Sequence, residues 1–252
     1  MARIEDKVVT VESLGALHDY NEKAYMLNTN PVGSGSFSLN RKNGTTIGDY
    51  SVAIGQNTTA SGRVSHAEGI SSVASGEASH AEGVDSVASG EASHAEGSSN
   101  AYGTDSHAEG TISNAYGISS HSEGFATYAG YFIKNEDETI ETFGNYTHTE
   151  GYYTKASSDY QHVQGKFNNE DYTGTYAHIV GNGTSDSKRS NAHTLDWEGN
   201  AWYAGNIEAA GNIEAAGNIE AEGSIILSSN QYGDVLPSAS TKGRIFFKKL
   251  SE

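Results

Sequence analysis

A five-residue motif recurs at a nearly constant step along the chain, and this repeat constrains the fold more than any other feature. Successive copies of SHAEG begin 14, 14 and 13 residues apart, and SHSEG follows after another 14. A shorter motif, A-x-G, begins about nine residues into each unit. The clear copies begin at Ser65, Ser79, Ser93, Ser106 and Ser120, and related pentapeptides begin at Ser36, Ser51, Thr147, Gln161 and Ala177.

Each unit therefore contains two short segments that end in glycine. Alternation of small and large residues within a segment is typical of a strand whose two faces differ. Glycine at the end of a segment suits a tight turn. A helix is disfavoured, because a glycine every five to seven residues costs about 1 kcal/mol each. The pattern predicts an all-β fold, in which each unit is one coil of a parallel β-roll solenoid.

The same alternation assigns the faces of the first segment. In SHAEG, Ser, Ala and Gly share the side that faces a thin interior, and His and Glu point out of the coil. Apolar residues occupy the outward positions in the earliest copies, so that face requires a partner surface. We expect three chains to bury it around a common axis. The predicted trimer interface is Phe37, Leu39, Val52, Ile54, His66, His80, His94, His107, His121, Ile207, Ile213 and Ile219.

Composition agrees with a repetitive fold. Only 35% of the 252 residues are apolar, and the chain has 30 Gly and 2 Pro, which is too little aliphatic bulk for a thick globular core. The chain has no cysteine, so disulfides are excluded. A net charge of −17 argues against nucleic acid as a partner. No apolar run predicts membrane insertion, and the N-terminal 15 residues do not have the pattern of a secretory signal.

The outward histidines are the only candidates for metal chemistry. In each clear copy a glutamate follows the histidine by two residues, so that the imidazole and the carboxylate share a strand face. A ladder of hydrogen bonds or ion pairs explains the pattern without an ion, and we predict no metal, no cofactor and no catalytic residue. The residues that could ligate an axial ion are His66, Glu68, His80, Glu82, His94, Glu96, His107, Glu109, His121 and Glu123.

The remaining segments divide the chain. Residues 1–35 are predicted to form an attachment segment with a short helix over 10–26, and residues 36–130 the regular coils. Residues 131–204 are expected to form degenerate coils with a hairpin or loop inserted at 131–146. Hexapeptides over 205–228, GNIEAA and its variants, are typical of an intertwined triple β-helix, and residues 229–252 read as a C-terminal β tail.

SVAIG followed by A-x-G at a 14-residue step resembles the head repeat of trimeric autotransporter adhesins (YadA-like). The resemblance covers roughly residues 36–130 and implies a left-handed parallel β-roll that forms a homotrimer. The later segments QHVQGKFN and AHIVGNGTSDSKRSN are similar to minor structural proteins of phages and prophages. The adhesins also have a signal peptide, a long coiled-coil stalk and a membrane anchor, and this sequence shows none of these patterns.

The resemblance to phage proteins leads us to expect a structural virion fibre of the tail, neck or head, with no enzymatic activity. Its expected partners are two further copies, other virion proteins at one terminus, and a glycan or protein of the host surface. The expected location is the virion, after synthesis in the host cytoplasm. The alternatives are a bacterial surface adhesin and a polysaccharide-degrading tailspike. Tyr102, Tyr116 and Tyr128, one coil apart, are either a stripe for glycan stacking or packing residues.

Overall fold

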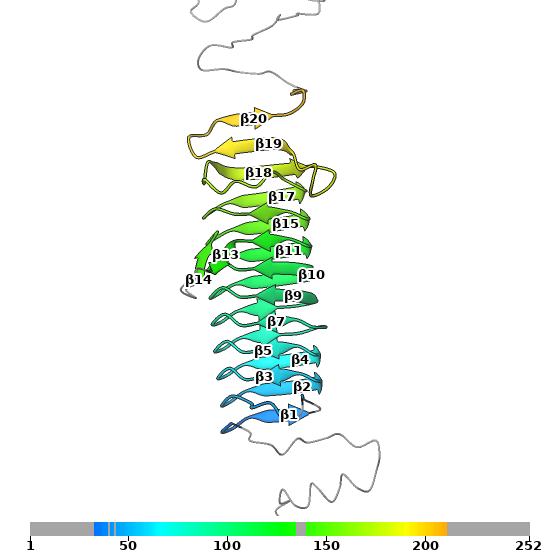
Figure 1. The fold of residues 1–252 in the computed structure, drawn as a ribbon, viewed down its shortest axis with the longest axis vertical. Helices are drawn as coiled ribbons and strands as arrows, with labels where there is room; N and C mark the ends of the chain where they lie inside the picture. The colour runs from blue at the N-terminus through cyan, green and yellow to red at the C-terminus, as the bar shows by residue number, and fades with distance from the viewer. Residues whose placement is uncertain (1–32, 40, 43, 135–139, 211–252) are drawn as a thin grey trace, which may run out of the picture. The chain divides into compact units, whose positions relative to one another are not determined.

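The computed structural model describes residues 33–210, except for residues 40, 43 and 135–139. The described part contains strands and turns and no helix, which confirms the all-β prediction. The described residues up to Ile207 belong to one compact unit, a solenoid of stacked coils (Figure 1). The second unit, Glu208–Glu252, lies almost wholly outside the described residues, as do the predicted N-terminal helix and β tail.

The pentapeptides form one column of parallel strands along the solenoid. Val52 pairs with His66, and His66 pairs with His80, so each copy of the motif lies in register on the copy before it. The strands of this column are β1 (Phe37–Leu39), β2 (Val52–Gln56), β4 (His66–Ile70), β6 (His80–Ala81), β8 (His94–Ala95), β10 (His107–Ala115), β11 (His121–Phe125), β15 (His148–Tyr152), β17 (His162–Lys166) and β18 (Tyr176–Asn182).

The A-x-G segments form a second column. Val73 pairs with Val87 and Ala74 with Ala88, again in parallel. The long strand β10 belongs to both columns, because its Asn114 and Ala115 pair with the second-column strands on either side. The other second-column strands are β3 (Thr59–Ala60), β5 (Val73–Ala74), β7 (Val87–Ala88), β9 (Ser98–Ala101), β12 (Tyr128–Ala129) and β16 (Lys155–Ala156).

The interior between the two columns is filled by small side chains, as predicted. Ala67 and Ala74, from facing segments of one coil, are both fully buried, and the serines that precede each motif are buried with them. Larger buried apolar groups lie toward the two ends of the solenoid: Ile47 packs with the first alanines, and Val163 and Ile179 of the last coils occupy the slot that alanine holds earlier. Because nothing larger fits in most coils, every bulky side chain of the repeat must lie outside.

Both glycines of a unit lie at turns and approach the next coil closely, but only the first needs the permissive backbone predicted for both. Gly69, at the end of the first segment, has φ +98°, which suits glycine. Gly76, at the end of the second, does not have a positive φ; instead, a Cβ there would lie 1.9 Å from the carbonyl oxygen of Gly90 in the next coil. The left-handed turn positions are held by ordinary residues at seven-residue steps, such as Val64 and Ser71.

A buried serine anchors each turn into the first column. The Ser79 hydroxyl donates a hydrogen bond of 2.8 Å to the carbonyl oxygen of Gly76, three residues earlier. Ser93 makes the equivalent bond to Gly90 at 2.7 Å. These bonds satisfy a hydroxyl that would otherwise be buried without a partner, a loss of about 1–3 kcal/mol each, and they reinforce the backbone hydrogen bond from the serine N–H to the same carbonyl. The serine that opens SHAEG is therefore a turn anchor.

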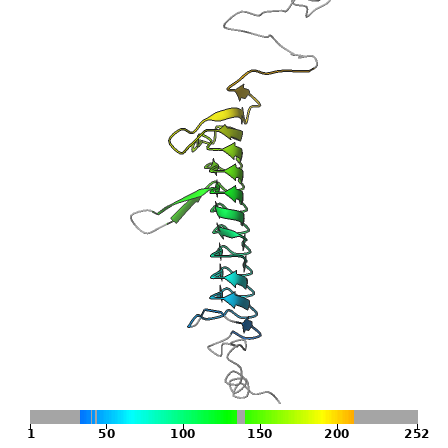
Figure 2. The same cartoon turned by 90° about the vertical axis from the view of Figure 1, so that its right-hand side faces the viewer.

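An inserted hairpin interrupts the repeat where the sequence predicts one. Strands β13 (Tyr131–Lys134) and β14 (Ile140–Phe143) pair antiparallel and project from the side of the solenoid (Figure 2). The parallel column resumes beyond it, because His121 of β11 pairs directly with His148 of β15. The hairpin is thus an insertion between two adjacent coils.

The described solenoid ends in an antiparallel cap. Strand β19 (Asn191–Asp196) pairs antiparallel with β18, and β20 (Ala201–Tyr203) pairs antiparallel with β19. Beyond them the first hexapeptide, residues 205–210, is exposed and forms no strand, and the other hexapeptides lie outside the described residues. The predicted triple β-helix stays a prediction.

The one 13-residue step is absorbed locally. The pairing of β9 with β10 shifts register between Thr111 and Asn114, opposite Ser98 and Asn100. On either side of the shift the motifs remain aligned, with His107 opposite His94. A missing residue therefore shortens one turn and leaves the columns intact.

Replacing Gly76 by alanine should destabilise the solenoid by at least about 3 kcal/mol, because the new methyl group collides with backbone that is itself hydrogen-bonded. Gly205→Ala is the matched control, since a Cβ there meets nothing within 4 Å, and its effect should stay within about 0.5 kcal/mol. Denaturant unfolding followed by circular dichroism measures both. Equal stabilities of the two variants would contradict the close-approach role of Gly76.

Candidate functional site

The outward face of the first column carries a continuous stack of imidazole rings. From His66 to His162 the successive ring centroids lie 4.7–4.8 Å apart, and the rings are within about 7° of parallel. The parallel register produces the stack, since each strand repeats its histidine at the coil spacing. We call this stack and its glutamates the histidine–glutamate ladder; its members are His66, Glu68, His80, Glu82, His94, Glu96, His107, Glu109, His121, Glu123, His148, Glu150 and His162.

Most imidazoles of the ladder face a carboxylate of the preceding coil. The His121 Nε2 lies 3.2 Å from Glu109 Oε1, within hydrogen-bonding distance. His148 and Glu123 make the equivalent contact at 3.3 Å. In earlier coils the contact is longer, 3.5 Å from His94 to Glu82 and 3.8 Å from His107 to Glu96. About a third of each of these side chains is exposed.

The apolar residues predicted to join this interface lie on the same two outward rows. Phe37 pairs with Val52, which precedes His66 in the histidine row, and Leu39 pairs with Ile54, which precedes Glu68 in the glutamate row. In the single chain Phe37 is 47% exposed and Ile54 36% exposed. The structure thus brings these predicted residues together with the ladder on one face. Ile207 is exposed beyond the cap, and Ile213 and Ile219 lie outside the described residues.

The ladder changes character at its C-terminal end. At the glutamate position after His162 the chain has Gln164, whose amide lies 3.1 Å from His178 Nε2. Burial, followed by the neighbouring imidazoles of His162 and His193, lowers the pKa of His178. The final coils therefore favour neutral imidazole hydrogen-bonded to an amide, whereas the earlier coils pair imidazole with carboxylate.

A second polar cluster ties the inserted hairpin to the solenoid. Lys155 Nζ lies 2.8 Å from Glu170 Oε1, and the Tyr172 hydroxyl donates a hydrogen bond to the other carboxylate oxygen. Lys155 also lies 5.7 Å from the centroid of the Tyr128 ring. The Tyr172 ring meets the Tyr131 ring of β13 edge-on at 5.5 Å. No repeat spacing in the sequence indicates this cluster, because its members come from irregular coils.

The electrostatics of that cluster centre on Glu170. Burial acts to raise its pKa, but hydrogen bonds from Lys155 and Tyr172 outweigh burial and hold the pKa below the usual value. Burial and the bond to Glu170 raise the pKa of Tyr172 to about 12. Both shifts favour an ionised carboxylate facing a protonated phenol, which agrees with the hydrogen bond between Tyr172 and Glu170.

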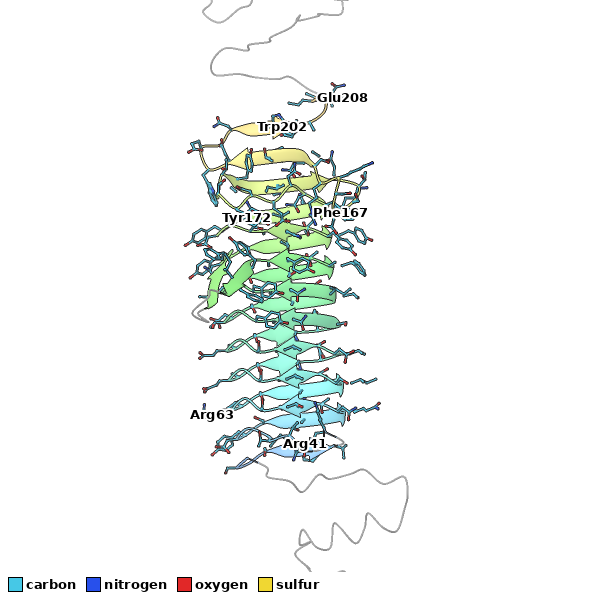
Figure 3. All side chains as sticks on the ribbon, viewed as in Figure 1. Arg41, Arg63, Phe167, Tyr172, Trp202 and Glu208 are labelled. Atoms are coloured by element: carbon cyan, nitrogen blue, oxygen red, sulfur yellow. The ribbon has the colours of Figure 1, made fainter. Side chains whose placement is uncertain are left out.

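An aromatic hollow of about 360 Å³ lies beside the base of the hairpin. Its lining includes Tyr160, Tyr172 and Trp197, each more than half exposed, together with the carboxylate of Asp159. The Trp197 indole donates a 3.1 Å hydrogen bond to the carbonyl of Gly174, which fixes the ring. Tyr172 lies at the same edge of the solenoid as the hairpin, opposite Phe167 (Figure 3). Exposed rings beside a carboxylate suit a ligand with apolar faces and hydroxyl groups.

The predicted tyrosine stripe is only partly correct. Tyr102 and Tyr116 stack with ring centroids 5.0 Å apart. Tyr128, however, pairs with Asn114, two positions before Tyr116, so it lies outside the stripe. In its place Phe132 of the hairpin meets the Tyr116 ring edge-on at 5.2 Å. The stack therefore packs against the hairpin at one end.

Three stretches of the chain, residues 47–63, 67–93 and 81–101, match the YadA head domain repeat. The matched stretches lie within the regular coils, and the second and third include members of the ladder. No curated protein matches the chain significantly. The described residues contain no helix that could cross a membrane. The regular coils are thus similar to the head repeats of YadA-like adhesins.

Glu170→Gln should make the protein less stable than the unchanged protein at neutral pH, by about 1–2 kcal/mol, because a charge-assisted pair is lost. The folded-state pKa of Glu170 is depressed, so this stability is present above the unfolded-state pKa and is lost as the pH falls through the folded-state pKa. The free energies of unfolding of the Glu170→Gln and unchanged proteins, measured from pH 7 into the acid range, should therefore converge.

Glu77→Gln is the matched control, since Glu77 pairs with Arg63 while about half of each side chain is exposed. That surface pair should contribute less than about 1 kcal/mol at any pH. If the difference in unfolding free energy between Glu170→Gln and the unchanged protein stayed constant as the pH fell, the Glu170 carboxylate would not be the source of the stability.

Proposed function

We propose that this protein is a structural attachment fibre, a homotrimer whose solenoids pack through the histidine–glutamate ladder face. The observation that carries the proposal is the continuity of that face. Val52 and Ile54 occupy the same rows as the histidines and glutamates, so apolar and half-exposed polar side chains form one surface along the coils. The match to the YadA head repeat supports the trimer, because such heads form homotrimers in general.

The fold supports a structural function more than a catalytic one. The ladder repeats the same pair of side chains coil after coil, whereas an active site needs a distinct set of groups around one cleft. A rigid stack of backbone-paired coils instead suits a spacer that holds a binding surface away from its base. The function that we propose is therefore adhesion, without enzymatic activity.

Assembly is tested by the mass of the native protein. Three copies of the 26.6 kDa chain should give a particle of about 80 kDa by light scattering or native mass spectrometry. Ile54→Asp should lower the trimer fraction, because three carboxylates would be buried around the axis without partners. Val73→Asp, on the outward face of the second column, should remain trimeric. A monomeric wild-type protein would overturn the proposal.

We place the fibre on a phage particle, as a tail, neck or head fibre attached to other virion proteins through one terminus. The basis is the similarity of the segments around Gln161 and Ala177 to phage structural proteins. The second candidate is a bacterial surface adhesin, which the match to the YadA head repeat favours. Mass spectrometry of purified phage particles and of the cell envelope decides between the two locations.

The aromatic hollow beside the hairpin is the surface that we propose for contact with a host glycan or protein. Trp197→Ala should reduce the binding of labelled trimer to bacterial cells about tenfold, because the ring offers a stacking face. Trp202→Ala is the control: both tryptophans are 54% exposed, but Trp202 lies outside this hollow. Flow cytometry measures binding. Equal losses in both variants would exclude the hollow as the specific site.

A further inference from the structure

We propose that the early coils of the histidine–glutamate ladder bind a divalent transition-metal ion, with Zn²⁺ as the probe. His80, Glu82 and His94 each offer a donor atom, and the three atoms lie within 4.8 Å of one another. One coil further on, His94, Glu96 and His107 repeat the arrangement. Each group lies within a single chain, so this inference does not depend on the proposed trimer.

The imidazole nitrogens of these coils lack the hydrogen bonds that a ladder without metal should supply. The Nε2 atoms of His66, His80, His94, His107 and His162 are shielded from solvent and have no hydrogen-bond partner among the described residues, and three of them, those of His80, His94 and His107, belong to three-donor groups. A shielded polar atom without a partner costs about 1–3 kcal/mol. Shielded nitrogens at three consecutive coils are thus oriented toward carboxylates but do not bond to them. A cation between the donors would satisfy the imidazole and the carboxylate together.

The spacing between imidazole and carboxylate donors fits a small ion better than a direct hydrogen bond. Ligands at about 2.0–2.1 Å in a tetrahedral zinc site are roughly 3.3 Å from one another. The His94 Nε2 lies 3.5 Å from Glu82 Oε1, and the His107 Nε2 lies 3.8 Å from Glu96 Oε1. Rotation of the half-exposed glutamate side chain would close this small difference. The two imidazoles of each group stack nearly parallel with ring centroids 4.7 Å apart, so at least one ring must also rotate about its side-chain bonds to point its Nε2 at a shared ion.

The donor set also selects the class of ion. Two imidazoles and one carboxylate are a known zinc set, which water completes as the fourth ligand. Calcium and magnesium prefer sites made of oxygen donors, so the two imidazoles in each group disfavour them. The later groups around His121 and His148 contain two carboxylates and one imidazole each, and their histidines already make hydrogen bonds. The early coils are therefore the stronger site.

Because both early groups use His94, they cannot both hold an ion through its Nε2 atom at once. His94→Gln should consequently remove the early-coil site altogether, whereas His80→Gln leaves the group of His94, Glu96 and His107 intact. His162→Gln is the matched control. Its imidazole stacks in the same ladder and lies 3.5 Å from Glu150, but His162 belongs to no three-donor group.

The experiment uses the full chain without a histidine tag, purified in buffer containing zinc and then dialysed, with bound metal measured by elemental analysis. Cobalt(II) substitution adds a visible spectrum that reports the coordination of the ion. We expect His94→Gln to weaken zinc binding by the early coils at least tenfold, and His162→Gln and His80→Gln to retain it. Zinc content equal in the His94→Gln and His162→Gln proteins, or absent from the wild-type protein, would overturn the proposal.

The outcomes for metal and for assembly can be separated. A trimer that holds no zinc would contradict the metal site and leave the proposed fibre unaffected. A monomer that binds zinc, and loses it on His94→Gln, would support the metal site and contradict the trimer. Circular dichroism of each variant establishes that the solenoid is folded, so lost zinc reports lost ligands.

Discussion

The structure depends on the close approach of successive coils through backbone hydrogen bonds. A Cβ on Gly76 would overlap the carbonyl oxygen of Gly90, so the coils stack as tightly as the backbone allows. In the regular coils the space between the two strand columns is filled by small side chains such as the fully buried Ala67 and Ala74. Stability therefore comes from many identical short-range pairings, and the bulky side chains of the repeat are displaced to the surface in fixed rows.

Much of this architecture could be predicted, because the repeat encodes it directly. The 14-residue step fixed the coil, and the alternation in SHAEG fixed which residues face inward. The shared slots of Val52 and His66, and of Ile54 and Glu68, followed from aligning the motifs and agree with the observed register. The hairpin near residues 131–146 was recognisable because it broke the pattern. Periodicity is informative here because each coil contacts mainly its two neighbours.

Two kinds of feature could not be predicted from the sequence. One is contacts within the degenerate coils, where the repeat is weak; the other is backbone and register geometry that residue type does not indicate. The cluster of Lys155, Glu170 and Tyr172 forms between degenerate coils, with no spacing to indicate it. The turns were predicted to rely on glycine, yet Val64 and Ser71 adopt positive φ, since serine anchors and coil pairing hold the backbone there. Tyr128 was assigned to the tyrosine stripe from its spacing alone, but the observed strand pairing places it in a different row of side chains.

The left-handed residues at seven-residue steps divide most coils into two halves of equal length. Because the chain returns to the same column after two halves, a duplication or deletion of one full coil would preserve every row above and below it. Each such event would change the length of the rod by the distance between paired strands, about 4.7–4.9 Å. Genes for rods of this kind can therefore lengthen or shorten by recombination between near-identical repeats, and the reach of the protein can evolve independently of its two ends.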